Sequence, residues 1–144
     1  MLIVPGRAAL SLARRARALA RGKAACEGLA SLDTRWVHLV VTARPLLAAE
    51  AEQLARMLAY GPDVPPMVPP DGSGAVTFWV APRVGTISPW SSKATDIAHV
   101  CGLPAVTRIE RAIEYAARGA RLDAAAIGRA LSDRMTESVL LDPA

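Results

Sequence analysis

Acidic residues are absent from the first 26 positions of this 144-residue chain, aromatic residues make up only 4% of it, and cysteine occurs twice. Long hydrophobic runs are missing too: the longest, WVHLVV and VTFWVA, have the length of a strand and fall short of the roughly 20 residues that span a membrane. Glycine-rich loops of the kind that hold nucleotide phosphates at the start of a βαβ unit do not occur either. These absences argue against a membrane protein and against a nucleotide bound at such a loop.

What the chain does contain is the composition of one globular domain, with 52% hydrophobic and 21% charged residues. At 144 residues it is long enough to bury a core of its own. Because Cys26 and Cys101 occur without a secretory signal, we expect reduced thiols and a cytoplasmic protein.

The N-terminal segment is strongly basic, with six Arg or Lys residues before Glu27. Such a segment resembles an organellar transit peptide, but LIVPG near its start predicts a short strand and a turn that belong to the fold. A nucleic-acid-binding face is the other functional interpretation. On a helix the arginines would lie opposite an apolar stripe, which is the ordinary pattern of a solvated face over a core, so we expect no nucleic-acid partner. The arginines are Arg14, Arg17 and Arg21, and the stripe consists of Leu12, Ala16 and Leu19.

Strand and helix patterns alternate from residue 34 onward. Residues 35–41 are apolar on both sides of their alternation and predict an inner strand, and residues 75–82 predict a second strand that Pro82 closes. Between them, residues 45–61 predict a helix, followed by a loop over residues 62–74, where five prolines occur. The buried stripe of this helix is predicted to be Leu47, Ala51, Leu54 and Leu58.

The second half continues in the same order. Residues 91–102 predict a helix that Ser91 or Ser92 caps and that Gly102 ends. Residues 106–115 alternate as a strand would, with a helix still possible, and Asp123 caps a final helix before a frayed tail, TESVLLDPA. The predicted fold class is α+β: a two-layer sandwich of about four mostly antiparallel strands, with helices packed on one face and a pseudo-twofold relation between the halves. The apolar positions of the two helices are Ile97 and Cys101 in the first, and Ile127 and Leu131 in the second.

Candidate chemistry is sparse. His99 and Cys101 are two residues apart and point to different sides of a helix, so we expect neither a metal site nor a catalytic thiol. The serines at the start of the same helix, with Lys93 and Asp96, would suit a phosphate, but a helix cap with a surface ion pair is the better interpretation. Trp90 follows Pro89 on the preceding loop, and it either folds back onto the core or serves as an anchor for a partner.

Five segments resemble, in order, the N-terminal domain of the large, single-chain phosphoribosylformylglycinamidine synthases of purine biosynthesis. The most specific is APRVGTISPWSSKATDIAHVCGL. This sequence departs from the family at Val84, Val100 and Ala112, where Pro, Asn and Gly are expected, and none of these changes removes a reactive group. The segments are residues 2–11, 60–62, 81–103, 106–115 and 131–139.

The resemblance implies that residues 1–144 form the first domain of a longer ligase, which uses glutamine, ATP and magnesium to make formylglycinamidine ribonucleotide from formylglycinamide ribonucleotide. This domain would hold no catalytic residue, metal or cofactor and would be inactive alone. Its partners would be the synthetase and glutaminase domains of the same chain, which it would join while helping to enclose a passage for ammonia. A stand-alone anion- or nucleic-acid-binding module is the alternative. The residues expected to dock on the other domains are Ser88, Pro89, Trp90, Ser91, Ser92, Lys93 and Asp96.

Overall fold

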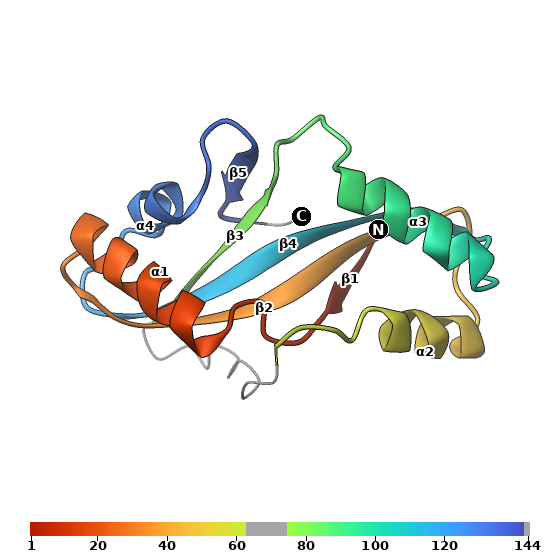
Figure 1. Ribbon diagram of the computed structural model, residues 1–144, viewed down its shortest axis with the longest axis horizontal. Helices are drawn as coiled ribbons and strands as arrows, with labels where there is room; N and C mark the ends of the chain where they lie inside the picture. Colours follow the sequence, from red (N-terminus) through yellow and green to blue (C-terminus); the bar gives the residue numbers. More distant parts are fainter. Residues whose placement is uncertain (63–74, 143–144) are drawn as a thin grey trace.

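A computed structural model describes residues 1–62 and 75–142 of the chain. Over these residues, five strands form one antiparallel sheet with four helices packed against it (Figure 1). None of the helices described is long and apolar enough to cross a bilayer. The elements are β1 (Leu2–Pro5), α1 (Leu12–Ala25), β2 (Leu29–Thr42), α2 (Ala48–Met57), β3 (Val76–Pro82), α3 (Pro89–Val100), β4 (Val106–Gly119), α4 (Ala124–Leu131) and β5 (Glu137–Leu140).

The long strands β2 and β4 pair at the centre of the sheet, in the order β1-β2-β4-β3-β5. Their register relates the two halves of the chain by a pseudo-twofold axis. A shift of 77 residues along the sequence carries Leu29 to Val106 and Thr42 to Gly119, and in the sheet Leu29 pairs with Gly119 and Thr42 with Val106. The same shift carries Ser11 to Ser88, and each of these serines is the N-cap of its helix. The predicted pseudo-twofold sandwich is confirmed, with one more strand than expected.

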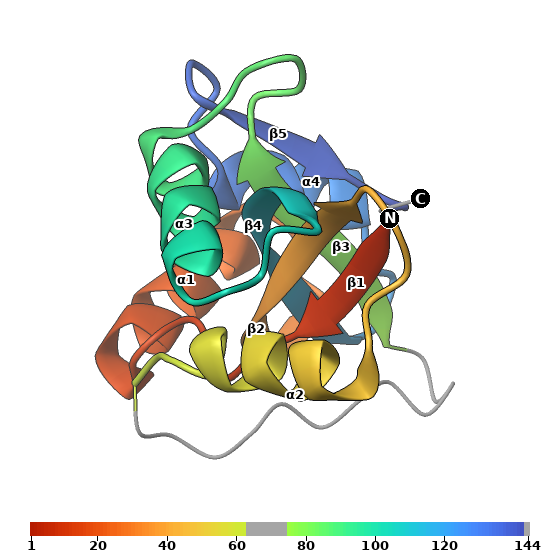
Figure 2. The same ribbon diagram turned by 90° about the vertical axis from the view of Figure 1, so that its right-hand side faces the viewer.

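The core is divided between the two ends of one sheet face. Residues of β4 that point to this face, such as Ile109 and Tyr115, belong to separate apolar clusters. Helices α1 and α4 cover one cluster, and α2 and α3 cover the other, so all four helices lie on the same side of the twisted sheet (Figures 1 and 2). The buried residues of the first cluster are Ala18, Cys26, Leu29, Leu32, Phe78, Val80, Tyr115, Ala117 and Ile127, and those of the second are Val40, Leu54, Leu58, Ala94, Ala98, Leu103, Val106 and Ile109.

Small residues, and not the large apolar ones, bring α1 close to the sheet. Ala18 and Gly22 are its buried positions, and a Cβ on Gly22 would lie 2.6 Å from Leu29 Cδ2. The predicted stripe is therefore wrong for Leu12, which is 57% exposed, and for Ala16, which is also exposed. Close approach selects the side with the least side-chain volume, which hydrophobicity alone does not reveal.

The apolar stripes predicted for the other helices also need correction. On α2, Leu54 and Leu58 are buried as predicted, but Leu47 and Ala51 are exposed because Leu46 packs against the core in place of Leu47. On α3, Ile97 and Cys101 are exposed, and the helix packs through small residues here as well. These are Ser91, Ala94 and Ala98. On α4, Ile127 is buried and Leu131 packs against the same cluster, as predicted.

Several predicted boundaries change. The prediction of a frayed tail is wrong, because residues 137–140 form β5 and pair with β3 from Trp79↔Leu140 to Pro82↔Glu137. Residues 106–119 are a strand, which settles the alternative left open there. The cap of α3 is Ser88 and not Ser91 or Ser92, and the helix begins at Pro89. The caps at Asp123 and Gly102 are confirmed, and most of the predicted proline-rich loop, residues 63–74, lies outside the described residues.

Candidate functional site

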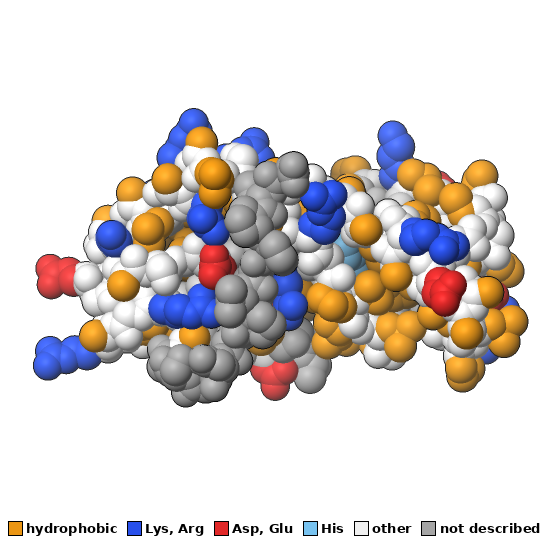
Figure 3. All heavy atoms as spheres, turned by 90° about the horizontal axis from the view of Figure 1, so that it is seen from below, with side chains coloured by type: hydrophobic (Ala, Val, Ile, Leu, Met, Phe, Trp, Pro, Cys, Tyr) orange, Lys and Arg blue, Asp and Glu red, His pale blue; other side chains and the backbone are white. Residues whose placement is uncertain are grey.

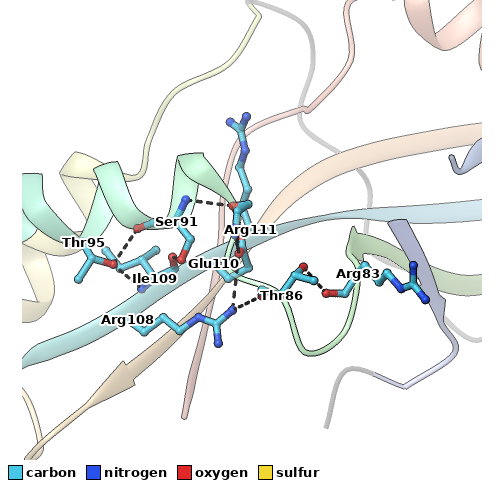
Figure 4. A network of polar contacts seen from close by, with 9 residues as sticks. Arg83, Thr86, Ser91, Thr95, Arg108, Ile109, Glu110 and Arg111 are labelled. Carbon is cyan, nitrogen blue, oxygen red and sulfur yellow. Dashed lines mark hydrogen bonds and ion pairs between the residues drawn. The ribbon is translucent and has the colours of Figure 1, made fainter. Parts of the chain in front are cut away.

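The first turn of α3 is attached to the sheet by a buried carboxylate. Ser88 Oγ accepts a hydrogen bond from the Ser91 backbone N–H at 3.0 Å and donates to Glu110 Oε1 at 2.9 Å. Glu110 is buried and also pairs with Arg108 at 3.7 Å, whose guanidinium donates to Thr86 O at 3.0 Å (Figure 4). The carboxylate therefore ties the loop before α3 to β4. It also places a negative charge of the chain itself beside the helix N-terminus, where a bound phosphate would lie.

Side chains of α3 also satisfy the free edge of β4. Strand β3 pairs with β4 only as far as Val80↔Ile113, so among the residues that the structure describes no strand pairs with that side of β4 nearer its N-terminus. There Ser91 Oγ donates to Ile109 O, and Thr95 Oγ1 accepts from Ile109 N at 3.1 Å (Figure 4). Buried backbone groups must find partners, and this helix face supplies them where the sheet does not.

Arg111 and two tryptophans occupy the centre of the helix-covered face, between the two core clusters. The guanidinium carbon lies 4.2 Å from the ring centroid of Trp36 and 4.5 Å from that of Trp90, within cation–π distance of both. One guanidinium nitrogen lies 3.4 Å from the Tyr60 hydroxyl. Beside these rings a cleft of about 300 Å³ opens between β4, the end of β3 and the start of β5, with Ser88 and Glu137 in its lining.

A buried histidine continues this polar chain. His38 is fully buried, with Nδ1 3.2 Å from Val4 O and Nε2 2.8 Å from the Tyr60 hydroxyl. Because a carbonyl can only accept, Nδ1 carries the hydrogen and Nε2 accepts from the Tyr60 hydroxyl. His38 is then a neutral imidazole. Burial lowers the pKa of His38 most, the positive charge of Arg111 lowers it further, and the Val4 carbonyl opposes both. Burial also disfavours the charged form of Tyr60 and therefore raises the pKa of its hydroxyl.

An apolar groove of about 220 Å³ runs between α2 and α3, on the other side of Trp90. Its exposed wall includes Ile97, which is 44% accessible to solvent. The lining residues are Met57, Leu58, Tyr60, Trp90, Lys93, Ala94 and Ile97. Trp90 is half-buried, packs against its own core and lines two cavities, so it folds back onto the core in part, and its role as an anchor for a partner stays a prediction.

The seven residues predicted to dock divide into three groups. Ser88 and Ser91 point inward and hold the helix, and Trp90 lies between core and solvent. The remaining four, Pro89, Ser92, Lys93 and Asp96, are exposed. Glu110 and Arg111 were not among the residues predicted to form a site. The alternation of Ile109 and Ile113 could have indicated Arg111, because it puts this charged residue on the apolar face of its strand.

The basic N-terminal helix has the predicted solvated arginines. Arg14, Arg17 and Arg21 are exposed, and Arg15 instead pairs with Asp33 at 2.9 Å. Seen from below, basic side chains gather over the half of the molecule that holds α1 (Figure 3). Among residues 1–62 and 75–142, no three His, Cys, Asp or Glu side chains come together as a metal site would need.

Comparison with known families identifies the chain. A family model described as formylglycinamide ribonucleotide amidotransferase N-terminal matches residues 35–144, well over half of the sequence. The chain belongs to this family. It is an N-terminal domain of an amidotransferase of purine biosynthesis, as the resemblance implied. The match begins within β2 and continues through β5, and thus includes Trp36, Trp90, Glu110 and Arg111.

Proposed function

We propose that this domain joins the synthetase and glutaminase domains of a longer, single-chain enzyme and helps to enclose the ammonia that passes between them. The enzyme would convert formylglycinamide ribonucleotide to formylglycinamidine ribonucleotide with glutamine, ATP and magnesium. In this proposal the chemistry belongs to the other domains, and this domain contributes a surface. Enclosure serves such a reaction because it keeps ammonia from loss and protonation in bulk water.

The observation that carries the proposal is the groove between α2 and α3. It is lined mainly by apolar side chains, it includes the aromatic residues Tyr60 and Trp90, and it lies beside an exposed, polar helix turn. Interfaces place aromatic anchors at the centre of such a surface with polar residues around them. Here Trp90 and Ile97 would be the central contacts, with Ser92, Lys93 and Asp96 at the rim.

The hydrogen bonds behind α3 support this role. Ser88 and Ser91 fix the first turn to β4, so the surface is already in its final shape before a partner arrives. A preformed surface loses less conformational entropy on docking than a loop that must first become ordered. The run of serines in the sequence is therefore divided between an inner pair that builds the surface and Ser92, which is available to a partner.

The test uses the full-length enzyme that carries this domain, with Ile97→Asp as the perturbation. Its control is Val100→Asp, which adds the same charge one turn further along, at a position 88% exposed and outside the groove. We expect I97D to lower glutamine-dependent turnover several-fold, to raise the amount of glutamate released per product, and to leave turnover with added ammonia near the wild-type value. V100D should change none of these. Wild-type coupling in both I97D and Trp90→Ala would refute the docking role.

A further inference from the structure

Arg111 has hydrogen-bond donors that the described residues do not use. Its guanidinium carries five N–H groups. Of these, one makes a long contact of 3.4 Å to Tyr60, and no carboxylate of the described residues lies within ion-pair distance. The rings of Trp36 and Trp90 cover the faces of the group but cannot accept from its edge.

The unused edge belongs to a side chain that is only half-buried and borders the cleft of about 300 Å³. The side chain of Arg111 points away from Arg108, with which Glu110 pairs, and it forms no ion pair with Glu110 itself (Figure 4). A guanidinium that is half-buried between aromatic rings interacts more strongly with an anion than a fully exposed one does. The cleft is therefore suited to a negatively charged group.

The lining of the cleft restricts which anion fits. Glu110 and Glu137 also border it, although each accepts internal hydrogen bonds, from Ser88 and from the Asp133 backbone N–H respectively. Their charges disfavour a dianion such as phosphate more than a monoanion. A carboxylate is planar, carries a single charge and matches the fork of a guanidinium with two parallel hydrogen bonds.

We propose that Arg111 binds the carboxylate of an Asp or Glu side chain that an adjoining domain of the enzyme inserts into this cleft. The inference rests on the proposed docking function and names the chemistry of its partner. The two tryptophan rings hold the guanidinium in place, so the pair forms with little loss of side-chain freedom. Trp90 then serves both contacts, since it borders this cleft on one side and the apolar groove on the other.

The first experiment titrates the ¹⁵N-labelled 144-residue chain with N-acetyl-aspartate amide and follows the indole N–H signals by NMR. N-acetyl-asparagine amide is the matched probe without charge, and Trp79, which points to the opposite sheet face from its neighbours Phe78 and Val80, is the internal reference. We expect the aspartate probe to shift the signals of Trp36 and Trp90 but not that of Trp79. Arg111→Lys, which keeps the charge but loses the fork, should weaken this binding roughly tenfold or more. Equal shifts with both probes, or no shift, would overturn the carboxylate site.

The second experiment compares the modification of arginine by phenylglyoxal in the full-length enzyme and in the 144-residue chain, with Arg111 read by peptide mass spectrometry. We expect Arg111 to be protected in the full-length enzyme, while exposed Arg129 reacts equally in both. Equal reactivity of Arg111 in both would overturn the adjoining carboxylate, even if the chain binds the free probe. Because the docking proposal is tested separately with I97D, loss of coupling there with an unprotected Arg111 would refute only the carboxylate.

Discussion

Removing one hydroxyl, in Ser91→Ala, tests how α3 is held on the sheet. Ser91 is only 1% exposed, and its Oγ donates to the backbone carbonyl of Ile109 at the free edge of β4. The substitution deletes the donor and leaves a buried carbonyl without this partner, at a cost of about 1–3 kcal/mol in the free energy of unfolding. The new methyl group adds no volume that could compensate.

The neighbouring Ser92→Ala is the matched control. Both serines lie in the first turn of α3, so the change in helix propensity is the same, but Ser92 is exposed. A surface substitution of this kind changes stability by no more than about 0.5 kcal/mol. The assay is urea denaturation of the 144-residue chain, followed by circular dichroism, with the three proteins at one pH. If S91A and S92A unfold at the same urea concentration as the wild type, the hydrogen bond to Ile109 contributes nothing and the account of the β4 edge is wrong.

Two further predictions concern the buried histidine and the last strand. Burial lowers the pKa of His38 below its ordinary 6.5, so as pH falls His38 takes up a proton in the unfolded chain before it does in the folded one. The free energy of unfolding should therefore decline below pH 6.5, by up to about 1.4 kcal/mol per pH unit. In urea denaturation measured over that range, His38→Asn should flatten this slope. A Cβ on Gly128 would lie 2.5 Å from Val139 Cγ1, so Gly128→Ala should lower the free energy of unfolding by about 1–3 kcal/mol. The added change Val139→Ala should restore much of the loss. If G128A instead stabilised the chain, as Gly→Ala does in an exposed helix, β5 would not pack on α4.

The predictions from sequence succeeded where a signal is local. Alternation of apolar residues indicated the strands at 35–41 and 75–82, and Asp123 and Gly102 indicated helix ends, because caps depend on side chains and backbone angles within one turn. Family resemblance rested on a contiguous segment, which needs no structure to be recognised. The candidate docking segment was located for the same reason.

Predictions failed where an outcome depends on what packs opposite. The tail TESVLLDPA was predicted to be frayed, yet residues Glu137–Leu140 of it pair with the free edge of β3. Leu12 and Leu47 were predicted to be buried because they are apolar, but the helices approach the sheet through Gly22, Ala98 and similar small residues. Burial of a helix face is decided by the distance at which two elements can meet.

The sequence by itself determined the local elements, the two-half order of strands and helices, and the family of this domain. Only the tertiary structure decided the roles of Ser91, Glu110 and Arg111. Each has a partner at least 18 residues away in the sequence: Ile109 for Ser91, Ser88 for Glu110 and Trp36 for Arg111. The register of β2 against β4 brings Trp36 and Arg111 to the same face of the sheet. A one-residue slip of that register would turn one of them to the other face, so this site exists only once the whole sheet has formed.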